Sequence, residues 1–344
     1  SHPSREVRLT AQRRLADLGR SRRAQISATG NRQSLLTSAP TSELIALLRD
    51  ASAPNLSRAH AVWALDGIDE GRAARPEIMT AASDGNRVLR QQATRQLGSR
   101  NAVEAVDALG ACLVDESASV RFEAATALGR IGQSSAVTSL LAALEEQDLF
   151  TRFAVFTALN RIGRAHPETW DAIAAGLSKD DERIREGTQF ALRETYDAQL
   201  AAVLARLAQS GGSSPVVRRL ALELLATITH KPPAWQGEWW AYHPALQPPP
   251  ERTIPWEGTE LILATLRSEL ANEDVGVRRV ALNGLLAAKD ASAAPQLRAR
   301  LPAERDLENQ RLILKTLAVI KDAAATPAVI RIINDDATPT ELRV

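Results

Sequence analysis

The residues best suited to recognition chemistry in this chain are aromatic, and most of them lie in one segment. Lys231 to Gly258 holds four of the six tryptophans and one of the two tyrosines. Both residue types offer a large apolar face with a polar edge, and both are enriched at binding hot spots. The candidate binding residues are Trp235, Trp239, Trp240, Tyr242, His243 and Trp256.

Two interpretations of this aromatic segment remain open. Its tryptophans could form the small core of a long loop packed on a scaffold. They could instead bind a partner protein or stack against a sugar, and inner rings could pack while outer rings bind. Prolines 232, 233, 248, 249, 250 and 255 prevent regular helix here, and they reduce the ordering cost of a binding surface.

The remaining reactive residues form no recognisable catalytic or metal-binding pattern. The five histidines lack the spacing of metal ligands, although Glu238, Glu251 and Glu257 could supply acids beside His230 and His243. The chain contains no phosphate loop, dinucleotide fingerprint, nucleophile elbow or haem-attachment motif. We therefore expect no catalytic residue, no cofactor and no metal.

Composition limits the partners more than it identifies them. The 344 residues are 44% hydrophobic but only 4% aromatic, so the core must consist of Leu, Ala, Ile and Val. The net charge of +1 gives no overall field that would attract nucleic acid. No run approaches the roughly 20 apolar residues that span a bilayer. The arginine-rich stretch from Ser1 to Gln33 is interpreted as a solvated helix and connection.

The elements that must position these residues are repeats. A residue that is usually hydrophobic precedes arginine again and again, followed by apolar residues at helical spacing, as in Val120-Arg121. The recurring arginines are Arg8, Arg58, Arg90, Arg121, Arg152, Arg185, Arg218, Arg278 and Arg311. Six of the eight steps between them measure 31–33 residues, and a fixed period of this size indicates stacked supersecondary units.

Each period is expected to hold two helices and no strand. The Arg-bearing helix has one apolar stripe, and a second apolar-striped helix follows it. Gly98, Gly132 and Gly163 are expected to end their helices in a left-handed conformation. Thr259 is expected to cap the helix that follows the aromatic segment. Neither helix can bury its stripe alone, so neighbouring hairpins must stack.

The pattern from Asp115 to Gly132, an aspartate followed by Val-Arg and an Ala/Leu stripe, resembles HEAT repeats of the short bacterial, PBS-lyase-like type. The resemblance implies an all-α, armadillo-like α-α superhelix, or solenoid, of about eight to nine hairpins. In such repeats the arginine pairs with an aspartate of the preceding turn, as Asp84 with Arg90 and Asp115 with Arg121. The expected structural ladder is Arg58, Arg90, Arg121, Arg152, Arg185, Arg218 and Arg278.

The two abnormal steps mark the departures from the period. Residues 1–230 and 259–344 are expected to form one continuous solenoid domain, and residues 231–258 the irregular Trp/Pro-rich insert between repeats. A flexible or partly helical connection is expected near Arg20 to Pro40. The terminal repeats lack polar capping faces, so we expect the chain to be part of a larger protein.

The insert carries a second, narrower resemblance. The tryptophans, prolines and Gly258-Thr259 resemble a motif in HEAT regions of exported multidomain proteins of planctomycete-type bacteria. There the HEAT region joins a sugar-dehydrogenase-like propeller to a c-type cytochrome. The resemblance implies an exported, periplasmic spacer, with redox chemistry in neighbouring domains. The residues themselves leave the compartment undetermined.

The sequence thus predicts a non-catalytic scaffold for protein–protein or interdomain docking. One alternative is a nucleic-acid-binding HEAT-like protein of the DNA-repair type, which the near-neutral charge disfavours. Another is carbohydrate contact through the insert. A third is an enzyme related to bilin lyases, for which no reactive group is found.

Overall fold

A computed structural model describes residues 39–234, 253–335 and 339–343 of the chain. These residues form helices and turns, with one isolated antiparallel bridge between Lys231 and Ile254. They fall into two compact units, Ser1–Thr169 and Trp170–Val344. The predicted helix around Arg8 and nearly all of the predicted connection from Arg20 to Pro40 lie outside the described residues.

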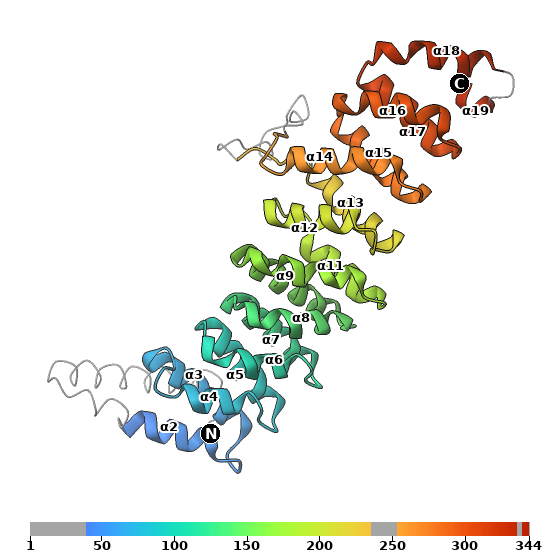
Figure 1. Ribbon diagram of the computed structural model, residues 1–344. Coiled ribbons are helices and arrows are strands. Elements are labelled where there is room, and N and C mark those ends of the chain that lie inside the picture. The colour runs from blue at the N-terminus through green and yellow to red at the C-terminus, as the bar shows by residue number, and fades with distance from the viewer. Residues whose placement is uncertain (1–38, 235–252, 336–338, 344) are drawn as a thin grey trace, which may run out of the picture. The chain divides into compact units, whose positions relative to one another are not determined.

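The first unit is a stack of short helices joined by tight turns (Figure 1). Its α-helices are α2 (Ala39–Arg49), α3 (Asn55–Asp69), α4 (Arg75–Ala81), α5 (Arg87–Ser99), α6 (Val106–Cys112), α7 (Ala118–Ile131), α8 (Val137–Ala142) and α9 (Leu149–Ala165). Its 3₁₀ turns are η2 (Val103–Ala105), η3 (Ser134–Ala136), η4 (Ala143–Glu145) and η5 (Pro167–Thr169).

The second unit has the same construction. Its α-helices are α10 (Trp170–Ala174), α11 (Glu182–Leu192), α12 (Ala198–Gln209), α13 (Pro215–Thr227), α14 (Thr259–Ser268), α15 (Val275–Ala288), α16 (Ala294–Arg300), α17 (Leu307–Val319), α18 (Thr326–Asn334) and α19 (Thr340–Arg343). Its 3₁₀ turns are η6 (Ala175–Ser178), η7 (Glu269–Ala271), η8 (Ala291–Ala293), η9 (Leu301–Ala303) and η10 (Ala323–Ala325).

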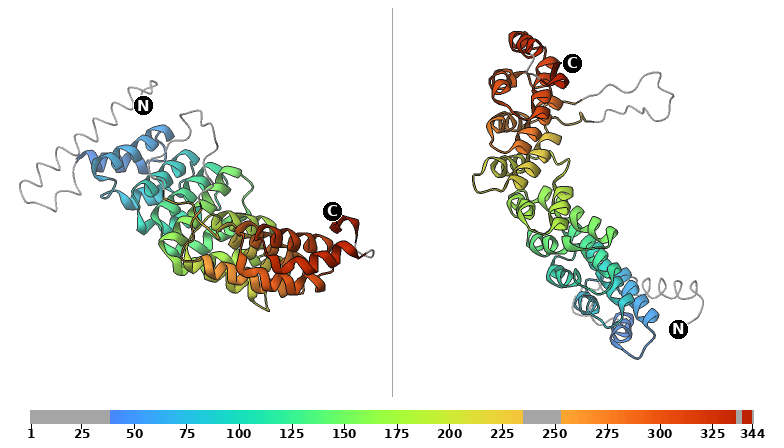
Figure 2. Two further views of the ribbon diagram at one scale, coloured as in Figure 1. Left: turned by 90° about the horizontal axis from the view of Figure 1, so that it is seen from above. Right: turned by 90° about the vertical axis from the view of Figure 1, so that its right-hand side faces the viewer.

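The Arg-bearing helices form one layer of each unit. In the first unit α3, α5, α7 and α9 pack side by side in that order, and in the second α13, α15 and α17 do the same. The other helices cover this layer, for example α6 on α7 and α12 on α13. The views in Figure 2 show the helices of each unit following one another in chain order. The predicted all-α arrangement of helical hairpins is confirmed.

Sequence period and burial agree within each hairpin. In α7, Val120, Ala124 and Leu128 are fully buried, each one helical turn from the next. Such a stripe turns one side of the helix toward the core and leaves the other to solvent. At its start α9 is capped by Asp148, whose carboxylate accepts a hydrogen bond from the Thr151 amide at 2.8 Å.

Neighbouring Arg-bearing helices approach each other through small residues. A Cβ atom added to Gly98 would lie 2.5 Å from the Cβ of Ala127, and one added to Gly129 would lie 2.8 Å from the Cα of Ala158. The expectation that Gly98 and Gly163 end their helices is therefore wrong, because both lie inside α5 and α9. Gly132 does end α7, with a φ of 74°.

The two tryptophans outside the insert have packing roles. Trp170 is completely buried. Trp63 is half-buried on α3. Its indole Nε1 donates a hydrogen bond to Gln92 on the neighbouring α5 at 2.9 Å, and its ring meets His60 edge to face. Aromatic residues are thus used sparingly to join adjacent helices.

The close approach of α7 and α9 leads to a stability prediction. Gly129→Ala should lower the free energy of unfolding by about 1–3 kcal/mol, because the added methyl meets backbone atoms that cannot turn aside. Gly110→Ala on α6 is the control, since its Cβ would meet only Ser139 at 3.6 Å. There the better helix propensity of alanine should raise stability by up to about 1 kcal/mol. Equal effects of the two changes in urea denaturation would contradict the close packing.

Candidate interaction surfaces and the arginine ladder

The recurring arginines connect successive hairpins through a three-part contact. Arg90 on α5 donates from Nε and Nη2 to the Asp115 carboxylate of the next hairpin, at 2.6 and 2.9 Å. Its Nη1 donates to the backbone carbonyls of Asp84 and Gly85, in the turn before its own helix, at 3.0 and 3.3 Å. One guanidinium therefore ties together two consecutive turns.

The contact recurs along the first unit. Arg58 donates from Nη1 and Nη2 to the Asp84 carboxylate at 3.3 and 2.5 Å, and from Nε to the Leu48 carbonyl at 2.9 Å. Arg121 donates to Glu146 at 2.5 and 3.0 Å, and to the carbonyl of Asp115 at 2.8 Å. The carboxylate of Asp84 accepts hydrogen bonds from Arg58 and its carbonyl accepts one from Arg90. Asp115 joins Arg90 and Arg121 in the same way, so the contacts form a continuous chain from Arg58 to Glu146.

The second unit contains the most deeply buried example. Arg278 donates from Nε and Nη2 to Glu304, both at 2.7 Å, and from Nη1 to the carbonyls of Asn272 and Glu273 at 2.8 and 2.9 Å. The side chains of Arg278 and Glu304 are 6% and 0% exposed. Burial of such a pair requires that the remaining polar atoms also be satisfied.

The ladder carboxylates also hold the turns in which they lie. Asp115 accepts a hydrogen bond from the Ser117 amide at 2.8 Å. Glu304 accepts from the amides of Arg305 and Asp306 at 3.0 and 3.1 Å. Each acid thus fixes the turn that begins the next Arg-bearing helix, so the spacing between hairpins is set by bidentate geometry.

The structure corrects two details of the predicted ladder. Arg90 and Arg121 do not pair with the carboxylates of Asp84 and Asp115 in the preceding turn; they bind the carbonyls there and the carboxylate of the following hairpin. In α17 the ladder position belongs to Gln310, whose Nε2 donates to the Glu304 carbonyl at 2.7 Å. The adjacent Arg311 lies 3.6 Å from Glu308.

The other predicted arginines, Arg152, Arg185 and Arg218, occupy the equivalent helical positions. Arg185 donates to the carbonyls of Lys179 and Asp180 at 2.8 and 2.7 Å. Arg218 donates to the Ser210 carbonyl at 2.8 Å, and Arg152 is half-buried on α9.

Ion pairing controls the ionisation of the ladder acids. Burial alone would raise the pKa of Glu304, but hydrogen bonds from Arg278 and from two backbone amides outweigh it and lower the pKa to about 2. The pKa values of Asp84, Asp115 and Glu146 are lowered in the same way, against the effect of burial, by Arg58, Arg90 and Arg121 respectively.

The aromatic insert leaves and rejoins the second unit at one point. Lys231 and Ile254 exchange backbone hydrogen bonds of 3.0 and 2.8 Å between the end of α13 and the start of α14. The indole Nε1 of Trp256 donates to the Ile228 carbonyl at 2.6 Å, and its ring meets Tyr196 edge to face at 5.9 Å. These contacts join the two stems of the insert to each other and to the scaffold.

Thr259 also holds the stem and is not the predicted cap. It is the first residue of α14, where its hydroxyl donates to the Thr229 carbonyl at 2.6 Å and accepts from the Trp256 amide at 2.9 Å. Of the candidate binding residues, Trp256 is half-buried in the stem. Five fall outside the described residues: Trp235, Trp239, Trp240, Tyr242 and His243.

A second apolar surface was not identified from the sequence. Leu149, Phe150 and Phe153 at the start of α9 are 76%, 78% and 61% exposed. Phe153 meets the half-buried Phe156 edge to face, with ring centroids 5.0 Å apart. The available signal was positional, because phenylalanine directly follows the ladder arginine at both Phe122 and Phe153.

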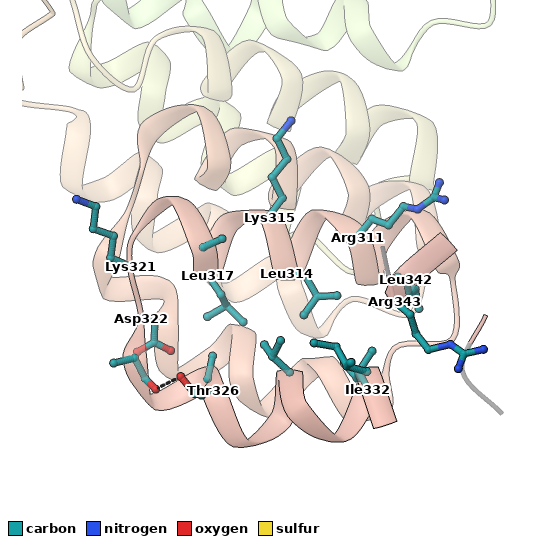
Figure 3. A pocket seen from close by; sticks show the side chains of 15 residues that line it. Arg311, Leu314, Lys315, Leu317, Lys321, Asp322, Thr326, Ile332, Leu342 and Arg343 are labelled. Atoms are coloured by element: carbon teal, nitrogen blue, oxygen red, sulfur yellow. Dashed lines mark hydrogen bonds between the residues drawn. The ribbon is translucent and has the colours of Figure 1, made fainter. Parts of the chain in front are cut away.

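A third apolar feature is a groove of about 650 Å³ between α17, α18 and α19. Figure 3 shows Leu314 and Leu317 of α17 facing Ile332 of α18 across it. The short α19 contributes Leu342-Arg343, which repeats the hydrophobic–Arg pair. In the second unit α13 is followed by α15, and α15 by α17, in the layer of Arg-bearing helices. The groove lies at the corresponding position beside α17.

The described residues lack two further features. They contain no group of three or more His, Cys, Asp or Glu side chains placed to hold a metal ion. Within the same residues, no helix combines the length and apolarity that crossing a membrane requires.

The buried ion pair predicts a large effect of removing one partner. Arg278→Met should lower the free energy of unfolding by about 3–5 kcal/mol, because it leaves the Glu304 carboxylate buried without a counter-ion. Arg206→Met is the matched control, since the Arg206–Asp171 pair is more than half exposed and should change stability by less than about 1 kcal/mol. Urea denaturation at neutral pH compares the two, and similar losses would contradict the ladder.

Ionisation of Glu304 predicts a pH-dependent contribution to stability. Its pKa is about 2 in the folded chain against an ordinary 4.5, so the contribution is complete above the ordinary value and disappears as the pH falls toward 2. The stability difference between wild type and Glu304→Gln should therefore decrease by about 2 kcal/mol from pH 5 to pH 3. A difference that does not vary with pH would show that the carboxylate is not stabilised in its charged form.

Comparison with protein families supports the fold. The family model of HEAT repeats matches residues 41–120 and 109–193. Among solved structures, human deoxyhypusine hydroxylase is 18% identical, covering 82% of this chain and 96% of its own, with a TM-score of 0.31. The complex of CpcE and CpcF of phycocyanin lyase from Nostoc sp. PCC7120 is 18% identical, covering 83% and 95%, with a TM-score of 0.35.

An engineered protein is 17% identical, covering 100% of this chain and 94% of its own, with a TM-score of 0.36. A search of the curated proteins found no match. The matched residues coincide with the hairpins from α2 to α11, which carry the ladder from Arg58 to Arg185. Residues 41–193 consist of HEAT repeats, and the chain has the all-α HEAT-repeat fold that its sequence predicts.

Proposed function

We propose that this chain is a non-catalytic scaffold that docks another protein, or a neighbouring domain of the same polypeptide, through its aromatic insert. The observation that carries the proposal is the fixed stem of the insert. The Lys231–Ile254 bridge and the Trp256–Ile228 hydrogen bond join both ends of the insert to one site on the scaffold.

A fixed stem favours presentation of the residues between its ends. Tethering both ends of a loop reduces the freedom that a partner must remove on binding, and prolines within the loop reduce it further. The half-buried Trp256 already serves the stem. This leaves Trp235, Trp239, Trp240, Tyr242 and His243 as the aromatic residues proposed for contact, a role consistent with the enrichment of tryptophan and tyrosine at hot spots.

The recurring arginines are assigned a structural role within the same proposal. Arg58, Arg90, Arg121 and Arg278 each bind a carboxylate and one or more backbone carbonyls, so little of their donor capacity is left for a ligand. A partner is therefore recognised by the side chains that project from this framework.

The narrower resemblance supplies a specific setting for the proposal. In that setting the chain is an exported spacer between a dehydrogenase-like propeller and a c-type cytochrome. The insert would then contact one of these domains and hold it at a set distance from the other. The aromatic motif from Trp235 to Thr259 is what supports this setting.

The proposal predicts separable effects on binding and on stability. A photoreactive amino acid at position 239 should crosslink a discrete protein or domain in the source cells, whereas one at Leu261, exposed on α14, should not. The captured partner should then bind Trp239→Ala/Trp240→Ala at least about tenfold more weakly, as expected for loss of two hot-spot rings. The melting temperature should stay within a degree or two of wild type.

The same titration identifies the competing outcomes. Equal affinity with equal melting temperature would exclude recognition by these rings. A large fall in melting temperature with unchanged affinity would show that the tryptophans only pack. Loss of binding to an oligosaccharide array, with protein binding intact, would favour carbohydrate contact. Leu261→Ala serves as the control for nonspecific loss of apolar surface.

A further inference from the structure

The exposed apolar side chains of α9 belong to a larger surface that continues onto α7. The contact between Gly98 and Ala127 recurs 31 residues later between Gly129 and Ala158, so α7 packs on α5 in the same register as α9 on α7. Residues 31 apart therefore hold equivalent positions on neighbouring helices. Phe122 on α7 is the equivalent of Phe153 on α9, and although it is half-buried it brings a second ring to the surface from the neighbouring helix.

Arginines lie at a regular distance from these rings. Arg130 and Arg161, again 31 residues apart, follow Phe122 and Phe153 by eight residues, which is about 12 Å along a helix. Both are exposed, as is Arg164 one turn further along α9. Within the described residues none of these three forms an ion pair, in contrast to the ladder residue Arg121 on α7, which pairs with Glu146.

The charges on this side of the unit are predominantly positive. The neighbouring α5 contributes the exposed Arg95, and α7 contributes the half-buried Glu123 between Arg95 and Arg130. At the arginine end of these helices four arginines thus accompany one carboxylate, whose pKa is raised by burial, while Asp148 and the exposed Glu116 lie before the opposite ends of α9 and α7. An acidic partner gains attraction from this imbalance and a basic one is repelled.

We propose that the face formed by Phe122, Phe150 and Phe153 with Arg130 and Arg161 binds an acidic amphipathic helix of a partner protein. Apolar side chains of the partner pack on the phenylalanines. Its carboxylates, two turns along the same helix, pair with the two arginines. This site lies in the first unit and is independent of the insert.

The arrangement fits a helix better than single-stranded nucleic acid. Proteins that bind single strands place aromatic stacking platforms directly beside the cations that follow the phosphates. Here rings and arginines are separated by about 12 Å, or two turns of helix. Leu149, at 76% exposure, enlarges the apolar end without offering a ring for a base to stack on.

A selection experiment tests the chemistry without assuming a partner. A phage-displayed library of random peptides, each about 16 residues and thus about four helical turns long, is selected on the full chain. Phage that also bind the Phe150→Ser/Phe153→Ser variant are discarded, so that the remaining peptides depend on these two rings. Enriched peptides should combine apolar residues with Asp or Glu seven or eight positions away. Enrichment of neutral or basic peptides, or of none, would overturn the proposal.

Variants then assign the two halves of the face. An enriched peptide, labelled with fluorescein, should bind Arg130→Gln/Arg161→Gln at least about tenfold more weakly, while its Glu→Gln version binds both proteins equally. Arg331→Gln and Phe190→Ser, exposed on α18 and α11, are the matched controls and should change nothing. Equal binding of the Glu and Gln peptides to wild type would refute carboxylate pairing.

Two further measurements remove the remaining ambiguity. Circular dichroism should show unchanged melting for the arginine variant, because both side chains are exposed. If Arg130→Gln/Arg161→Gln unfolds, Arg130→Lys/Arg161→Lys takes its place in the binding measurement. The lysine variant keeps the positive charges and should retain most of the affinity for the peptide. If a thymidine oligonucleotide competes with the peptide more strongly than unlabelled peptide does, the face binds nucleic acid and the proposal fails.

Discussion

The contact between a ladder arginine, the carboxylate of the next hairpin and the carbonyls of its own turn is the constraint on which the rest of the structure depends. A helical hairpin of this kind cannot bury its apolar stripe alone, so its position must be fixed by its neighbours. Apolar packing is not directional, so burial of the stripe alone does not fix the spacing between hairpins. A bidentate guanidinium–carboxylate contact with hydrogen bonds near 2.7 Å does fix the position of one hairpin against the next.

This contact also separates two kinds of arginine on the same helices. Arg121 is committed to Glu146 and to carbonyls of its own turn, whereas Arg130, nine residues later, is exposed and without an ion pair in the described part of the chain. The period places the first against the next turn and the second on the solvent side. A repeat scaffold can therefore vary its outward residues without disturbing the framework, and binding specificity can accumulate there.

The insert follows the same logic. It departs after α13 and returns at α14, so the stacking of α12 on α14 and of α13 on α15 is retained across it. Its stem is closed by backbone hydrogen bonds, by the Trp256 indole and by the Thr259 hydroxyl. Long insertions cost little when their ends are held close together. The scaffold thus accommodates an aromatic addition while its period continues on either side.

The sequence by itself determined the helical hairpins, their period, the ladder positions from Arg58 to Arg278 and the location of the insert. Each is encoded locally, by apolar spacing within one helix or by proline between helices. Only the tertiary structure decided which acid each arginine binds, because a carboxylate 25 residues away and one six residues before are equally plausible on paper. It likewise showed that Gly98 serves close packing, that Gln310 replaces Arg311 in the ladder and that Phe150 and Phe153 remain exposed. These features depend on the neighbouring hairpin, and contacts between hairpins leave no local pattern in the chain.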